Sequence, residues 1–449
     1  MGRQRSGEMA KGKARGNGLK IPPDGILTKA KVRRMGRTIR IAVFSLSVLV
    51  LLYVSFGYVF GQSTNERPYR SLTVYGEVLD HIQEDYVDQP DLHLVTVGAL
   101  HGLLEALDPE SSYLSPREFE AWKKESADRG KGSIGVEISR RGYIFVLSDL
   151  PNSPALKAKL HEGDILEAIS GFTTQDMSIQ QAKLLLDGAP GSTVKVSLIR
   201  RGSLRPVDVE VTRAIVPRPG LLTTRLQDKI GYLRIASFDP GSARQVRGQI
   251  EQFERQGVQR LIVDLRGCAS GEASEAIQTA QLFLSSGTIA TLRGQTIATK
   301  TFSADPSKVA WKGPLSVLMS GSTAGASEIF AAAIAQNHRG DAVGQNTQGM
   351  ASEQKLIPLQ DGSALFLTVG IYYTPDGKAI LNNGVAPTVQ VPPPNSQQTL
   401  LDAQDVAPDP TPGELPVPKD PVLQKAISIL GANSGSGAAT TAVAAASGF

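Results

Sequence analysis

The chain has very little cysteine and histidine, which argues against a disulfide-linked fold and against a metal site. Cys268 is the single cysteine among 449 residues, so no intramolecular disulfide can form. The protein would tolerate an oxidising compartment without intramolecular disulfides. The five histidines show no metal-ligand spacing, and we expect neither a metal nor another cofactor. Apolar residues make up 41% of the chain and charged residues 20%, which predicts globular cores in two or three domains.

The amino-terminal region joins a basic tail to an uncharged apolar stretch. Residues 1–40 contain twelve lysines and arginines against Glu8 and Asp24, whereas residues 41–60 carry no charge. About 20 helical residues cross the hydrocarbon core of a bilayer. We therefore expect a cytoplasmic tail (1–40), a transmembrane anchor (41–61) and a single-pass protein of the bacterial inner membrane. The bulk of the chain would then lie in the periplasm.

Other interpretations of this region are weaker. A cleaved signal peptide is disfavoured, because no small-residue cleavage site follows residue 60 and the apolar run exceeds the usual length of about 7–15 residues. A buried core helix is the remaining alternative for the apolar run. The basic tail could bind nucleic acid, but its place beside that run favours anionic lipid, so we expect no nucleic-acid partner.

Residues 62–131 are predicted to form a linker and a helical lobe. Apolar residues recur there at three- and four-residue steps, namely Leu72, Val74, Val78, Leu79 and Ile82. A second helix is expected over about 92–107, before Asp108-Pro109. Ser115-Pro116 is typical of the start of a third helix.

Residues 132–214 alternate short β-rich runs with turns and two helical stretches. The expected order is strand, strand, short helix, strand, longer helix, strand, strand, which resembles a PDZ domain. Successive N–H groups at a glycine turn can hold a terminal carboxylate, and a strand edge can pair with the peptide backbone. We therefore predict that the domain binds protein C-termini. The expected binding loop is Gly132, Ser133, Ile134, Gly135 and Val136.

Residues 215–391 alternate strands with amphipathic helices, which predicts an α/β sheet of buried and largely parallel strands. The run 261–267 is a continuous apolar strand, and 314–320 is a strand that leads into a helix from about residue 325. Residues 392–449 are rich in Pro, Ser, Ala and Gly, so we expect disorder there, with a short amphipathic helix possible at 421–430.

The segment VLMSGSTAGASEIFAAAIAQNHRGD (317–341) resembles the nucleophile region of the carboxyl-terminal processing (tail-specific) serine peptidases. With the LDPESSYLSPREF string near residue 107, the resemblance covers about residues 70–391. It implies an α/β fold, namely a crotonase-like (ClpP-like) α/β/α peptidase core with an inserted PDZ domain, a helical amino-terminal lobe and a single transmembrane helix.

The resemblance also assigns the reacting positions. The family's nucleophilic Ser falls on Gly325, its Lys base 25 residues later falls on Met350, and its third triad member is matched by Gln354. The N–H of Ala326, at the helix start, would remain as an oxyanion donor. Neither Gly325 nor Met350 can act as nucleophile or base. We therefore predict a membrane-anchored member that binds peptide ends without cutting them, and that is free to form a homo-oligomer.

The alternative is an active serine-type endopeptidase with a relocated nucleophile. Ser327 is two residues along the helix, about 200° around it, and is expected to point away. Ser322 lies on the entry loop, and Cys268 lies in the loop that replaces the family's D-L-R-N-N-P-G-G with Asp264–Gly271 as DLRGCASG. Lone cysteines are usually small buried packing residues. None of the three candidates is favoured as nucleophile.

Overall fold

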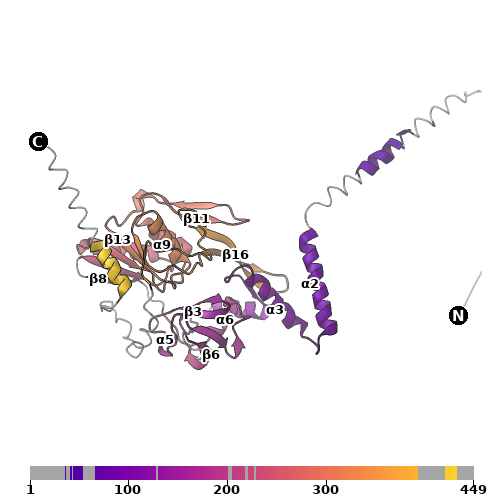
Figure 1. Cartoon of the computed structure of the whole chain (residues 1–449), viewed down its shortest axis with the longest axis horizontal. Coiled ribbons are helices and arrows are strands. Elements are labelled where there is room, and N and C mark those ends of the chain that lie inside the picture. Colours follow the sequence, from indigo (N-terminus) through magenta and orange to yellow (C-terminus); the bar gives the residue numbers. More distant parts are fainter. Residues whose placement is uncertain are drawn as a thin grey trace, which may run out of the picture. The chain divides into compact units, whose positions relative to one another are not determined.

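The computed structural model describes residues 36, 41–42, 44–53, 66–127, 130–200, 205–217, 221–226, 229–392 and 420–431. The chain divides into two compact units, residues 1–92 and 93–449. Figure 1 shows their elements with the labels used below. The first unit contains α2 (Glu66–Asp85), and its apolar side chains Leu72, Val74 and Val78 are largely exposed.

The predicted membrane anchor is the main error of the sequence interpretation. Residues 41, 42 and 44–53 are helical, but no helix in the described part of the chain is long and apolar enough to cross a membrane. The single-pass inner-membrane location is therefore wrong. Residues 54–60 and, except for residue 36, the basic tail lie outside the described residues.

The second unit begins with helices that match the expected lobe. They are α3 (Leu92–Glu105) and α4 (Pro116–Ala127), with the short strand β1 (Ser112–Leu114) between them. The backbone N–H and the hydroxyl of Ser115 both donate to Glu118 in the first turn of α4, at 2.8 and 2.7 Å. This contact ties the residue before Pro116 to the helix start, as the sequence indicated.

Residues 132–214 form a separate small sheet with two helices and a core of their own. The strands lie in the order β2 (Val136–Arg141), β3 (Tyr143–Asp149), β4 (Ile165–Ile169), β6 (Thr193–Ile199) and β7 (Val207–Thr212), with β5 (Phe172–Thr173) beside β4. The helices are α5 (Pro154–Lys157) and α6 (Ile179–Leu186). Ser178 caps α6 through the N–H of Gln181 at 3.2 Å. The chain order of strands and helices is the one expected from the sequence.

The larger core is built on a six-stranded sheet. Its order is β17 (Val389–Gln390), β14 (Asp341–Gly344), β13 (Leu315–Met319), β10 (Arg260–Asp264), β9 (Ile230–Ile235) and β8 (Leu221–Leu226). All neighbouring pairs are parallel except β8 with β9, which confirms the expected α/β sheet. A second, antiparallel sheet contains β1, β11 (Thr288–Arg293), β12 (Lys300–Ser303), β15 (Ser352–Pro358) and β16 (Ala364–Tyr373).

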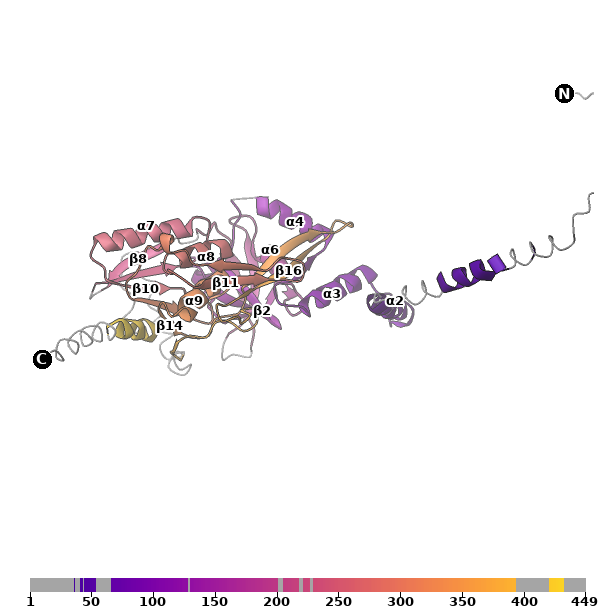
Figure 2. The same cartoon turned by 90° about the horizontal axis from the view of Figure 1, so that it is seen from above.

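Alternate residues of the parallel strands face two different cores, as the period of two in a strand requires. Leu261 and Val263 pack with α7 (Ser242–Arg255), α8 (Ala273–Gln281) and α9 (Ala326–Gln336). Ile262, between them, packs on the other face against a helix formed by residues 421–431. Figure 2 shows α7 and this carboxyl-terminal helix on opposite sides of the strands.

Residues 421–431 form the short helix that the sequence allowed at 421–430 within the otherwise disordered tail expected from composition. Its residues Leu423, Ala426 and Leu430 are buried against the sheet. Asp420 precedes it and accepts the N–H groups of Val422 and Leu423, at 3.1 and 3.0 Å. The rest of the expected disordered segment, 393–419 and 432–449, lies outside the described residues.

Candidate active site

Gly325 lies at the turn between β13 and α9. Its backbone angles are φ 65° and ψ −121°, a conformation that residues with a side chain rarely adopt. A Cβ placed on Gly325 would have no heavy atom within 4 Å apart from its chain neighbours. The turn therefore has a backbone geometry that would strain a residue with a side chain, as at a nucleophile position, and it has space for a side chain that Gly325 does not have.

A buried carboxylate joins this turn to the position 25 residues later. Glu328 Oε2 accepts the N–H of Gly325 at 2.8 Å and the N–H of Met350 at 2.6 Å. Its Oε1 accepts the Thr347 hydroxyl at 2.5 Å and the Gly349 N–H at 2.6 Å. Since Gly325 and Met350 bond to one oxygen atom, the two sequence-predicted positions lie together. Burial raises the pKa of Glu328, and its four donors oppose that rise.

Gln354 is held on β15 in a network that leads to the turn before β1. Its Nε2 donates to Thr368 Oγ1 at 2.9 Å, and that hydroxyl donates to Asp108 Oδ1 at 3.1 Å. Ser111 Oγ donates to Asp108 Oδ2 at 2.8 Å. In this arrangement Gln354 orients the 108–111 turn against β16.

The three alternative nucleophiles are all buried. Ser327 Oγ donates to the carbonyls of Cys268 and Ala324, at 2.7 and 2.8 Å. Ser322 Oγ shares a hydrogen bond of 2.8 Å with Ser320 Oγ. Burial raises the pKa of the Cys268 thiol to about 12. A thiol with that pKa is protonated near neutral pH and is a poor nucleophile.

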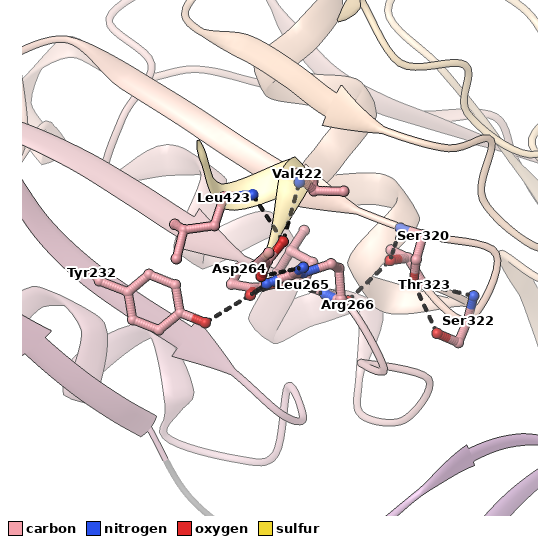
Figure 3. Close-up of polar contacts among 10 residues, drawn as sticks. Tyr232, Asp264, Leu265, Arg266, Ser320, Ser322, Thr323, Val422 and Leu423 are labelled. Atoms are coloured by element: carbon pink, nitrogen blue, oxygen red, sulfur yellow. Dashed lines mark hydrogen bonds and ion pairs between the residues drawn. The ribbon is translucent and has the colours of Figure 1, made fainter. Parts of the chain in front are cut away.

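The loop after β10 is held in place by charged groups (Figure 3). Asp264 accepts the Tyr232 hydroxyl at 2.7 Å and a bidentate contact from Arg266, whose NH2 lies 2.6 Å from Oδ2. Arg266 NH1 also pairs with Asp420 at 2.7 Å. Further along, the Cys268 N–H donates to Leu265 O at 3.0 Å. That N–H is therefore turned into the loop and is not free to stabilise an oxyanion.

The expected carboxylate-binding loop is largely bonded within the fold. The N–H groups of Gly132 and Ser133 donate to Gly188 O and Ala214 O, and the Gly135 N–H donates to Ser133 Oγ. Ile134 is fully buried. Val136 starts β2, which pairs with β3 and has no second strand partner in the described part of the chain. β2 is thus one edge strand of this sheet, as β7 is at the other end, and an edge strand can offer backbone pairing to a peptide.

Residues that sequence reasoning missed are mainly buried carboxylates. Glu328 stands three residues after Gly325, at the helix position that often bonds back to the cap residue, so a capping signal was present. Glu110 follows Asp108-Pro109, and burial raises its pKa to about 7. Asp420 is the third. No local sequence signal identifies Glu110 or the pairing of Asp420 with Arg266, because both depend on distant segments.

Taken together, the parallel α/β sheet and the helix that starts at Gly325 define a peptidase-like scaffold. The model of peptidase family S41 matches residues 229–391. Over 335 residues the chain is 28% identical to the carboxy-terminal-processing protease of Bartonella bacilliformis, covering 73% of this chain and 77% of that protein. It is 30% identical over 302 residues to the carboxyl-terminal-processing protease of Picosynechococcus sp., covering 66% and 72%.

A solved structure of the photosystem II D1 C-terminal processing protease resembles the chain with a TM-score of 0.60 and 25% identity. The match covers 71% of this chain and 92% of that one. The chain therefore belongs to peptidase family S41, the carboxyl-terminal processing serine peptidases.

Proposed function

We propose that this protein is a noncatalytic member of its family that binds the carboxyl-terminal ends of unfolded or extended chains. The observation that carries the proposal is the pairing of Gly325 and Met350 on one carboxylate oxygen of Glu328. The scaffold that brings a nucleophile and a base together is present, but neither residue has a group that can attack a carbonyl or take a proton near neutral pH.

The contacts of the alternative nucleophiles support this proposal. An attacking hydroxyl needs a nearby base and access to the scissile carbonyl. The Ser327 hydroxyl lies within hydrogen-bond distance of two carbonyl oxygens, and Ser322 Oγ is hydrogen-bonded to Ser320 Oγ. Cys268 is fully buried, and its raised pKa keeps it a thiol.

Peptide binding would use residues 132–214 as a PDZ domain. The edge strand β2 would supply backbone groups, and α6, which contacts β2, would flank the peptide. Binding and catalysis use separable interactions, so loss of the reacting groups does not remove affinity. Since the N–H groups of Gly132, Ser133 and Gly135 are bonded within the fold, we propose that strand pairing along β2 supplies most of the affinity.

The test is a cleavage assay on the purified full chain. An unfolded protein with an apolar carboxyl terminus is incubated with the wild type and with a Gly325→Ser, Met350→Lys double variant, and products are identified by mass spectrometry. We expect no cleavage by the wild type, and the double variant serves to ask whether the scaffold can still support it. Wild-type cleavage that disappears in Ser322→Ala, Ser327→Ala or Cys268→Ala would overturn the proposal in favour of a relocated nucleophile.

Binding is measured in parallel by fluorescence anisotropy with a labelled peptide that ends in a free carboxylate. The same peptide with an amidated end is the matched control. Tighter binding of the free carboxylate supports recognition of chain ends. Equal binding of the two forms would contradict it and leave strand pairing alone.

A further inference from the structure

A small cavity lies beside Met350, and a carboxylate faces it. The cavity has a volume of about 130 Å³. Its walls come from three segments: the turn before β1, strand β2, and the loops around Met350 and Leu381. The lining residues are Pro109, Glu110, Ser139, Arg140, Arg141, Gln348, Gly349, Met350, Leu381 and Asn382.

The backbone that carries Glu110 is held firmly. Asp108 Oδ1 accepts the N–H groups of Glu110 and Ser111, at 2.9 and 2.7 Å. The same carboxylate is bonded to Thr368 on β16. The Glu110 side chain therefore reaches the cavity from a turn that has little freedom to withdraw it.

Glu110 Oε1 is buried and has no hydrogen-bond partner within the described residues. A buried carboxyl oxygen without a donor is costly, because it has lost its water and gained nothing in return. Native proteins contain few such groups, and each has a specific cause, such as a catalytic role or a water, an ion or a ligand that completes it. The open oxygen thus points to a missing donor in the cavity.

Three cationic side chains lie near Glu110, and none donates a hydrogen bond to its Oε1: the Lys183 ammonium opposes the rise in the pKa of Glu110, and Arg140 and Arg141 line the cavity. The guanidinium of Arg140 already contacts the carbonyls of Gly142, Met177 and Gln175 and pairs with Glu105. Arg141 reaches Gln348 Oε1 at 3.4 Å. The remaining walls, including Ser139, Gln348 and Asn382, are neutral. Glu110 is the one carboxylate in the lining, and its Oε1 has no donor among the described residues, so the cavity suits an organic cation better than a divalent metal, which needs several oxygen ligands.

We propose that this cavity is a specificity subsite for a lysine side chain of the bound peptide, with the Glu110 carboxylate as its counter-charge. The proposal rests on the proposed peptide-binding function and names the kind of peptide that it favours. The ammonium of the ligand would occupy the neighbourhood of Met350, which lines the same cavity. Met350 has no charge and therefore does not compete for Glu110.

The test uses the full chain and labelled ten-residue peptides with an apolar carboxyl terminus. Each peptide carries lysine at one position in turn, and its control carries norleucine, which has a similar shape and no charge. We expect one position at which lysine tightens binding about tenfold, the effect of one buried charge-assisted hydrogen bond. That preference should disappear in Glu110→Gln, while the affinity for the norleucine peptide stays the same.

Two variants show whether the effect is local. Glu120→Gln removes an exposed carboxylate on α4, so it changes the net charge equally and should keep the lysine preference. Met350→Lys places an ammonium at the cavity wall and should reduce the preference as Glu110→Gln does. Thermal unfolding of each variant checks that it is folded.

The outcomes separate the two proposals. If lysine and norleucine peptides bind equally well at every position, or if the preference survives in Glu110→Gln, the subsite is wrong and peptide binding stands. If a glutamate-containing peptide binds best, Arg141 is the recognition group and the subsite is again wrong. If no peptide binds the wild type, the proposed function and the subsite both fail.

Discussion

Two glutamates border Met350, and they differ in how their oxygens are used. Glu328 is buried and accepts four hydrogen bonds, from Gly325, Thr347, Gly349 and Met350. Glu110 has a buried oxygen with no donor in the described part of the chain. Both oxygens of Glu328 accept hydrogen bonds from the chain itself, whereas Glu110 Oε1 can still accept one.

Within one small region, Glu328 holds the structure together, whereas Glu110 is the residue that we propose binds a ligand. A carboxylate with all its donors in the same chain fixes the relative positions of two loops and has nothing to offer a ligand. A carboxylate with an open oxygen weakens the free protein and gains from a ligand that donates to it. The following predictions challenge that distinction.

The largest effect is expected for Glu328→Ala. The change leaves four donors without their acceptor, so the free energy of unfolding should fall by at least about 3 kcal/mol. Urea denaturation of the full chain measures the loss. Glu328→Gln keeps the side-chain volume and one acceptor oxygen, and its loss should be smaller. If Glu328→Ala lowers the free energy of unfolding less than Glu328→Gln does, the hydrogen bonds to Glu328 are not what holds the two loops.

Glu110→Gln should have the opposite sign and depend on pH. The pKa of Glu110 rises from its ordinary 4.5 to about 7 in the folded chain. A carboxyl with a raised pKa contributes its full stability below about pH 4.5 and loses it as pH rises towards 7. The variant should therefore gain up to about 3 kcal/mol on the wild type between pH 4.5 and pH 8.

Urea denaturation of both proteins at the two pH values measures this gain, with Glu120→Gln as a control that should show none. A Glu110→Gln variant that is less stable than the wild type at pH 8 would mean that the Glu110 carboxylate already has a partner. Glu110 and Glu328 would then both be partnered carboxylates, and the difference between them would not hold.

Asp420→Ala concerns a third carboxylate, whose donors come from its own helix and from Arg266. Loss of the cap and of the ion pair should weaken the docked helix by about 1–2 kcal/mol. Hydrogen exchange of the amides in 421–431 reports this locally. Asp420→Asn keeps the cap and removes the charge, so its exchange should be intermediate. Unchanged exchange in both variants would show that apolar packing alone holds the helix.

The smallest effect is expected for Gly325→Ala. The new methyl group meets no atom, so the cost is the backbone conformation alone, about 1 kcal/mol. Gly321→Ala is the matched control, because Gly321 lies in the same loop with equal space and without a positive φ. Thermal unfolding compares the two. Equal midpoints would indicate that the turn at Gly325 relaxes once a side chain is present.

Much of the core could be predicted because its signals are local. Buried parallel strands appear as continuous apolar runs such as 261–263, and alternating cores follow from the period of a strand. The spacing of 25 residues located Gly325 and Met350, and the shared bonds to Glu328 show that this spacing corresponds to proximity.

The rest depended on partners far apart in the chain. The burial of Glu110 requires β2 and the loop at Met350, and neither is signalled near residue 110. Helix 421–431 is short, and its stability comes from the sheet that it covers, so its sequence alone gave only a weak indication. The membrane-anchor prediction relied on apolar composition over 41–60, and no helix among the described residues is long and apolar enough to cross a membrane.

The backbone at Gly325 also bears on how easily a lost activity could return. Serine at that position must hold a conformation that glycine adopts without strain, and it brings no catalysis while residue 350 is methionine. Lysine at 350 alone has no hydroxyl to activate. Under the proposed noncatalytic function, either single substitution would therefore lower stability or bring no catalysis, and only the two together would supply both a nucleophile and a base.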